Sequence, residues 1–217
     1  MTSCYSKQLG QFVILGRNGG YMIFVMNESD WLLLIYKVPA EPSKKRLALW
    51  RKLKGLGAVY LQNGVCLLPK SDHHRRQFKI IQNEIGEMGG ESFLLESSGF
   101  DRRQQELIAG RFNEERNAEY REFLGRCADY LAEIERETAA RNFTYAELQE
   151  NDEDLKKLKS WLEKIGRLDF YGAELAAEAA RQLLLCEERL EEFSQAVFAA
   201  EHERLKSRPF PPSEENP

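Results

Sequence analysis

The chain has 217 residues and a formal net charge of -4, with 42% hydrophobic and 30% charged residues. This balance is ordinary for a soluble globular protein that buries a real core, in one large domain or two small ones. No stretch approaches the roughly 20 apolar residues of a membrane span, so we expect a protein that does not enter the membrane.

Four cysteines, Cys4, Cys66, Cys127 and Cys186, lie far apart in the sequence and form no Cys-x-x-Cys pair. This spacing argues against a disulfide framework and against a structural zinc site, and it favours a reducing, cytoplasmic compartment. We interpret the last three as small hydrophobic residues buried in a strand and in two helices.

The charges are distributed unevenly along the chain. Residues 31–90 hold 11 Lys and Arg against 4 Asp and Glu, whereas residues 91–217 hold 18 against 29. A basic front and an acidic back predict two regions with different partners.

Residues 1–29 allow two interpretations. Apolar runs on either side of Gly16–Gly20 fit an extra β-hairpin, and the glycine-rich interruption spoils a signal-peptide core. Alternatively, the segment precedes the true start of the protein, since Met22 and Met26 come just before the first regular strand.

A strand, a helix and a hairpin follow one another from Trp31. The apolar run 31–38 predicts a central strand that Pro39 ends. Pro42 and Ser43 then begin an amphipathic helix to Gly57, whose predicted core face holds Leu47, Trp50, Leu53 and Leu56. Asn63–Gly64 between two apolar runs predicts a hairpin with a type I′ turn.

A second helix and a fourth strand complete this region. Ser71 or Asp72 caps the helix, which turns Phe78, Ile81 and Ile85 inward, and ESFLLESS at 91–98 predicts the strand. The order strand, helix, strand, strand, helix, strand predicts a ferredoxin-like βαββαβ domain over residues 30–99, hence an α+β fold.

Long charged helices follow Gly99. Thr144-x-x-Glu147 is a capping box, Asp169 is the expected cap of the next helix, and apolar residues recur at heptad spacing from Ala176 to Val197. We predict an antiparallel three-helix bundle over residues 100–206 and a disordered tail over 207–217. A heptad seam left exposed would form a homodimer interface.

Basic residues at two helix starts are the sharpest functional signal. Cations cost free energy where a helix begins, so their presence there calls for an explanation. In the split βαβ topology we expect the first and third strands to be parallel neighbours, so that both helices begin at one sheet edge. They would then form a single rim that binds oxyanions or a phosphate backbone, composed of Lys37, Lys44, Lys45, Arg46, Lys70, His73, His74, Arg75 and Arg76.

Other interpretations of these residues stay open. They fit a solvated surface that improves solubility, and the rim also fits docking onto the acidic helical region. The adjacent pair His73 and His74 points about 100° apart on a helix, and no further ligand joins it, so we predict no metal site. No glycine-rich phosphate loop or Ser/His/Asp arrangement is present, and we predict neither a cofactor nor an enzymatic activity.

Several motifs resemble the N-terminal region of the chromate-resistance protein ChrB family. They are W-L-L-L-x-Y-x-V-P at 31–39, L-W-R-x-L-K-x-L-G-A-V-Y-L at 49–61, N-G-V-x-L-L-P at 63–69, F-x-x-x-R-x-x-E-Y at 112–120 and L-x-x-W-L-x-x-I at 158–165. The ferredoxin-like half is also similar to the C-terminal domain of phenylacetate-responsive repressors and to the small CRISPR spacer-acquisition nucleases.

The resemblance implies a chromate-responsive transcriptional regulator from a chromate-resistance operon. Longer family members carry an additional C-terminal domain, and we expect this chain to end before one begins. The nuclease-type fold needs an aspartate after the tyrosine that ends its first strand, and here Lys37 follows Tyr36. This favours binding over metal-dependent cleavage.

The sequence therefore predicts a cytoplasmic regulator that binds DNA through the basic edge, with chromate or a related oxyanion as effector, and it also fits a homodimer. The alternative is a protein-interaction or assembly module of the same operon that does not bind DNA. The operator sequence and direct chromate binding are left open.

Overall fold

The computed structural model describes residues 10–14, 21–25 and 30–206, and packing divides the chain into two compact units. Unit 1 holds the residues up to Glu119 together with Lys164–Ala176, and unit 2 holds Tyr120–Glu163 and the residues from Ala177 onward. The strands are β1 (Gly10–Ile14), β2 (Tyr21–Val25), β3 (Asp30–Lys37), β4 (Val59–Gln62), β5 (Val65–Pro69) and β6 (Glu91–Ser98). The helices are α1 (Ser43–Gly55), α2 (Asp72–Glu87), α3 (Arg102–Ala139), α4 (Tyr145–Arg167) and α5 (Ala176–Lys206).

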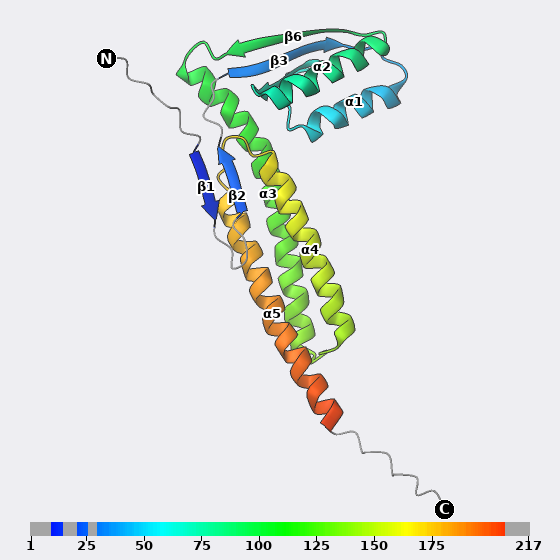
Figure 1. The fold of residues 1–217 in the computed structure, drawn as a ribbon, viewed down its shortest axis with the longest axis vertical. Helices are drawn as coiled ribbons and strands as arrows, with labels where there is room; N and C mark the ends of the chain where they lie inside the picture. The colour runs from blue at the N-terminus through cyan, green and yellow to red at the C-terminus, as the bar shows by residue number, and fades with distance from the viewer. Residues whose placement is uncertain (1–9, 15–20, 26–29, 207–217) are drawn as a thin grey trace, which may run out of the picture. The chain divides into compact units, whose positions relative to one another are not determined.

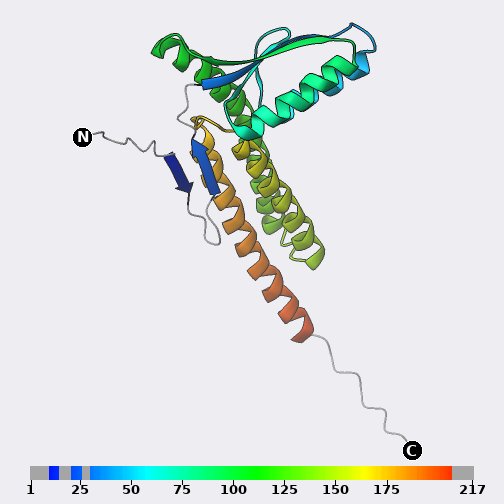
Figure 2. The ribbon, with the colours of Figure 1, turned by 45° about the horizontal axis from the view of Figure 1, so that its top comes forward.

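Unit 1 contains a four-stranded sheet in the order β4-β5-β3-β6, and every neighbouring pair is antiparallel. Helices α1 and α2 lie on one face of this sheet (Figures 1 and 2). The predicted α+β class is confirmed. Among the described helices, none combines the length and the apolar character that crossing a membrane requires.

The N-terminal strands β1 and β2 pair antiparallel, with Gly10 opposite Val25 and Ile14 opposite Tyr21. This pairing agrees with the hairpin interpretation of residues 1–29. The connection at 15–20 lies outside the described residues, as do residues 1–9 and 26–29. Whether the segment precedes a later start stays untested.

The core of unit 1 corrects the predicted inner face of α1. Leu49 and Leu53 are the buried residues of this helix, whereas Leu47 and Trp50 remain 45% and 47% exposed. Both the predicted and the observed stripe pass through Leu53, so apolar spacing alone did not distinguish them. With Leu49 inward, the flanking Lys52 and Lys54 reach carboxylates on α2 and α3.

The hairpin between β4 and β5 is confirmed, but its predicted turn type is wrong. A type I′ turn needs positive φ at both central residues. Among the described residues, Arg141 is the one non-glycine residue with positive φ, so Asn63 is not in that conformation, while Gly64 has φ +73°. Gly64 also approaches β3 closely, since its carbonyl oxygen accepts a 2.7 Å hydrogen bond from the Tyr36 N–H.

Unit 1 also includes two segments from the helical half of the chain, residues 100–119 and 164–176. Phe112 of α3 and Phe170, which follows α4, belong to the same buried core as the sheet and α1. Their rings lie 6.0 Å apart. The packing thus places residues 100–119 and 164–176 with the sheet, whereas the predicted boundary lay at residue 99. The boundary between folding domains stays a prediction.

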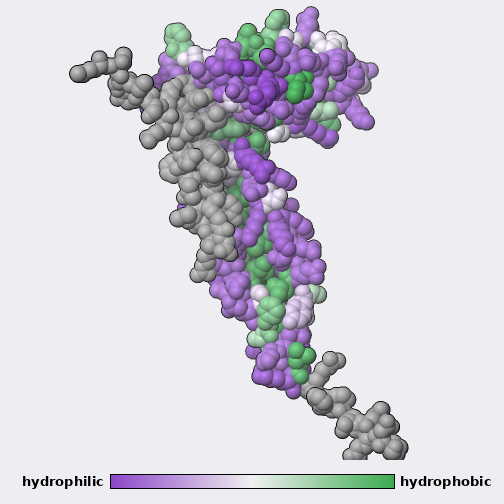
Figure 3. Space-filling model, in the orientation of Figure 1, coloured by the Kyte–Doolittle hydropathy of each residue, from purple (hydrophilic) through white to green (hydrophobic). Residues whose placement is uncertain are grey.

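Unit 2 is built from the second half of α3 and most of α4 and α5. Ring contacts join Phe123 to Trp161 and Phe143 to Phe193, each at 5.7 Å. On the face shown in Figure 3, a band of apolar side chains runs along this unit between polar ones. Phe123 and Trp161 thus join α3 to α4, and Phe143, in the connection between these two helices, contacts α5.

The predicted helix caps can be compared with the structure directly. Ser71 Oγ accepts from the His74 N–H, and Thr144 Oγ1 accepts from the Glu147 N–H, so both caps are confirmed. Asp169 caps an earlier turn than expected, because its carboxylate accepts from Gly172 N and Ala173 N and α5 begins only at residue 176. The predicted disordered tail, 207–217, lies outside the described residues.

Candidate anion-binding surface

The first turn of α1 carries three consecutive exposed cations, Lys44, Lys45 and Arg46. The helix follows Pro42, has no side-chain cap and holds no acidic residue in its first turn. No ion pair joins these three side chains to any other residue in the described part of the chain. A helix start already carries positive partial charge. The three cations add to it, and no acidic side chain in this turn balances them, so the turn is a favourable position for an anion.

Two further cations extend this surface. Lys37 is exposed at the end of β3, where the chain turns toward α1, and Arg51 is exposed farther along the helix. We call Lys37, Lys44, Lys45, Arg46 and Arg51 the α1 cationic surface. Glu41 is the one acidic residue in the sequence 37–51.

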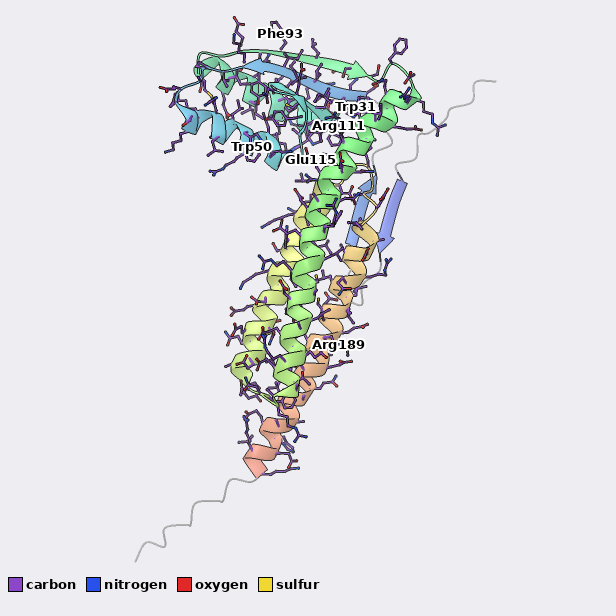
Figure 4. All side chains as sticks on the ribbon, turned by 180° about the vertical axis from the view of Figure 1, so that it is seen from behind. Trp31, Trp50, Phe93, Arg111, Glu115 and Arg189 are labelled. Atoms are coloured by element: carbon purple, nitrogen blue, oxygen red, sulfur yellow. The ribbon has the colours of Figure 1, made fainter. Side chains whose placement is uncertain are left out.

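Trp50 was predicted to lie in the core, but it is about half exposed on the same helix (Figure 4). An exposed indole beside guanidinium and ammonium groups suits stacking on a base or contact with a sugar. Its spacing from other apolar residues had suggested that Trp50 packs in the core. The alternative apolar face of the helix, which contains Leu49 and Leu53, would have predicted that Trp50 is exposed.

The predicted single rim is wrong, because β3 and β5 are antiparallel rather than parallel. Trp31 at the start of β3 lies opposite Pro69 at the end of β5, and Lys70 N donates to Asp30 O at 3.1 Å. Lys37 lies at the far end of β3, opposite Glu91. Residues 70–76 therefore lie near the end of the sheet where β3 begins, and the α1 cationic surface lies near the end where β3 finishes.

Two of the cations near the start of α2, Lys70 and Arg75, pair with one carboxylate of β6. Glu96 Oε2 accepts from Lys70 Nζ at 2.8 Å, and Glu96 Oε1 accepts from Arg75 Nη2 at 2.6 Å. These hydrogen bonds lower the pKa of Glu96, and the same contact raises the pKa of Lys70. Of this second group, His73 and Arg76 remain exposed without an ion pair in the described residues.

His74 belongs to the core rather than to an anion site. Its side chain is buried, Nδ1 donates to Pro69 O at 2.7 Å, and the ring meets Phe170 edge-on at 5.2 Å. Burial lowers the pKa of His74, against the smaller opposing effect of the Pro69 hydrogen bond. A neutral imidazole that donates from Nδ1 fits this position.

The burial of His74 predicts a pH-dependent stability. With the folded-state pKa below its ordinary value of 6.5, the unfolded chain takes up the proton first as pH falls. We expect the free energy of unfolding to fall between about pH 7.5 and pH 5.5, and His74→Gln to flatten this dependence. Urea titrations at several pH values measure both slopes, and parallel curves for the two proteins would contradict the assignment.

A partly buried polar cluster joins α1, β3, β4 and α3, and no local pattern in the sequence predicted it. The hydroxyls of Tyr36 and Tyr60 lie 2.9 Å apart, and Lys54 Nζ contacts both Glu115 Oε2 at 2.6 Å and the Tyr60 ring at 5.9 Å from its centroid. Burial raises the pKa of both tyrosines, and it raises the pKa of Cys66 to about 12. The two tyrosines and Cys66 are therefore neutral at physiological pH, which suits a structural role.

The three cysteines of the described residues, Cys66, Cys127 and Cys186, are buried and free, as the sequence predicted. Cys4 lies outside the described residues. Within the described ranges, no three or more His, Cys, Asp or Glu side chains are grouped so that they could hold a metal ion.

Fold and surface together define an α+β protein that presents an open cationic helix start. The family model described as the N-terminal part of protein ChrB matches residues 46–204. The chain therefore belongs to this family. Of the α1 cationic surface, Lys37, Lys44 and Lys45 precede the matched range, and Arg46 is its first residue.

Protein ChrB of Cupriavidus metallidurans strain CH34 is a curated relative. It is 26% identical over 160 residues, which cover 71% of this chain and 44% of the relative. The chain thus spans less than half the length of that relative.

Proposed function

We propose that this chain acts in chromate resistance as a transcriptional regulator that binds DNA through the α1 cationic surface. The family resemblance supports the chromate connection. The observation that carries DNA binding is the first turn of α1, with three exposed cations that no ion pair satisfies in the described residues. Such a turn contacts phosphate oxygens with both its side chains and its free backbone N–H groups.

The second basic group contributes less to this proposal than the sequence suggested. Glu96 already satisfies Lys70 and Arg75, and a phosphate would have to compete with that carboxylate. The α1 cationic surface offers the larger uncompensated charge, and Trp50 adds a stacking platform on the same helix.

The proposal includes a fold assignment and a binding rather than catalytic role. The strand order β4-β5-β3-β6, with all pairs antiparallel, supports a ferredoxin-like domain over residues 30–99. The ring contacts of α3 with α4, and of the connection between them with α5, support an antiparallel three-helix bundle. Lys37, in the place of a nuclease aspartate, supports the non-enzymatic role.

The test is a fluorescence anisotropy titration with a labelled duplex from upstream of the gene, at about 50 and 200 mM salt. We expect K44A/K45A/R46A to weaken binding at low salt by about tenfold or more. The slope of log K against log salt should become shallower by about 2.7, since each lost phosphate contact accounts for about 0.9. Repeating the titration with chromate, and with sulfate for comparison, tests the effector: chromate should release the DNA and sulfate should not.

The matched control is K156A/K157A/R189A, which removes the same charge from α4 and α5, where these side chains pair with Asp152, Asp154 and Glu192. This variant should bind as the wild type does. Equal losses in both variants would show that net charge alone matters. An absence of binding by the wild type at low salt would refute the proposal.

A protein-interaction module is the second candidate, and one observation favours it. Phe93 and Leu95 expose large apolar side chains on the sheet. Co-purification of the full chain with a second protein but not with nucleic acid would support this function in place of DNA binding.

A further inference from the structure

The two edges of the sheet in unit 1 are protected unequally. The edge strand β4 has four residues and an irregular register between Tyr60 and Gln62, and Arg111 Nη1 donates to Tyr60 O at 3.4 Å. A short, irregular strand with an occupied carbonyl discourages further strand pairing. The edge at β4 is therefore blunted.

The opposite edge, β6, is longer and more regular, although the Gln82 side chain of α2 donates from Nε2 to Ser92 O at 3.3 Å. Its eight residues pair with β3 without interruption from Asp30–Ser98 to Lys37–Glu91, and contain neither proline, glycine nor lysine. No second strand pairs with β6 in the ranges that the structure describes. Apart from the Ser92 carbonyl, its outer row of backbone N–H and C=O groups is thus available to another strand.

The side chains of β6 divide between the two faces of the sheet. Glu96 points toward α2, where Arg75 and Lys70 neutralise it, so alternation places Phe93 and Leu95 on the other face. These two residues are 62% and 48% exposed, and Figure 4 shows Phe93 on the side away from α1 and α2. An exposed apolar strand at an unprotected edge is a site for association.

We infer that two copies of this chain pair through β6, antiparallel and related by a two-fold axis at Leu94. In this register Phe93 lies opposite Leu95 of the second copy, and Leu94 lies opposite itself. Glu91 and Glu96 each face a serine of the second copy, Ser97 and Ser92, so no like charges oppose each other.

The two neighbouring symmetric registers are less favourable. With the axis at Leu95, Phe93 would face Ser97 and Leu94 would face Glu96 of the second copy, and with the axis at Phe93, Leu95 would face Glu91. The axis at Leu94 is thus the register in which both exposed apolar side chains face apolar ones. This pairing does not involve the heptad seams, which the sequence had suggested as an interface, and does not depend on DNA binding.

The dimer would form one eight-stranded sheet, and a two-fold axis perpendicular to that sheet keeps both copies of α1 and α2 on the same side. Two α1 cationic surfaces would then face the same way, as a regulator that reads two half-sites requires.

Charge substitutions at β6 test the pairing by sedimentation velocity on the full chain at micromolar concentration. We expect the wild type to sediment as a dimer. F93K/L95K should raise the dimer dissociation constant at least tenfold, because lysines then oppose lysines in two places. The control F100K/L107K changes two exposed apolar residues at the start of α3 and should leave the dimer intact. Urea denaturation should show unchanged folding for both variants.

Mixing two variants tests the register itself. F93E/L95E should also be monomeric alone, and an equal mixture with F93K/L95K should recover the dimer, since lysine at 93 then faces glutamate at 95 of the second copy. A monomeric wild type, or a dimer that F93K/L95K leaves intact, would overturn the inference. A mixture that stays monomeric would overturn the pairing of Phe93 with Leu95.

Discussion

Replacing Phe112 with alanine should lower the free energy of unfolding by about 3–5 kcal/mol, the usual cost of truncating a buried phenylalanine. The ring is 2% exposed and contacts Phe170 and Tyr171, with centroids at 6.0 and 5.2 Å. It belongs to the core that the sheet, α1 and α2 share. Urea denaturation followed by circular dichroism measures the loss.

Phe100→Ala is the matched control, because it makes the same chemical change twelve residues before Phe112, outside that core. Phe100 is 97% exposed, so its truncation should change the free energy of unfolding by no more than about 0.5 kcal/mol. Equal values for the two variants would contradict the assignment of residues 100–119 to the core of unit 1.

Gly64→Ala should destabilise the protein by about 2–4 kcal/mol, although it adds a single methyl group. A side chain in the left-handed region costs about 1–2 kcal/mol, and Gly64 has φ +73°. In addition, a Cβ there would lie 2.3 Å from the Tyr36 carbonyl oxygen, which is backbone and has little room to move. The hairpin or the end of β3 must shift, and the midpoint of urea denaturation reports the cost.

The comparison for this variant is Gly125→Ala within α3. No atom outside the helix backbone lies within 4 Å of a Cβ at that position. Because alanine favours a helix by about 1 kcal/mol over glycine, this change should stabilise the protein slightly. A loss of stability at Gly125 similar to that at Gly64 would show that the close approach to Tyr36 is not what matters.

Local signals in the sequence predicted the elements of unit 1 well. Pro39 ends β3 within two residues, Ser71 caps α2 as expected, and Gly64 turns the β4–β5 hairpin. These positions were predictable because backbone geometry and capping act between residues close in sequence.

Strand direction and ion pairing were less accessible. Helix α1 returns the chain so that β4 runs in the direction of β3, and the hairpin then reverses β5, the strand that lies beside β3. The rim prediction failed because it treated this neighbour as parallel. Glu96, which neutralises Lys70 and Arg75, comes more than 20 residues later in the chain, and no local pattern links it to them.

The buried cysteines give each compact unit a native reporter of its own breathing motions. Cys66 lies in the core of unit 1, and Cys127 and Cys186 lie in unit 2. A thiol enclosed in this way reacts with an alkylating reagent only when its surroundings open. Labelling rates at Cys66 and at the other two cysteines would therefore give separate opening free energies for the two units, without an engineered probe.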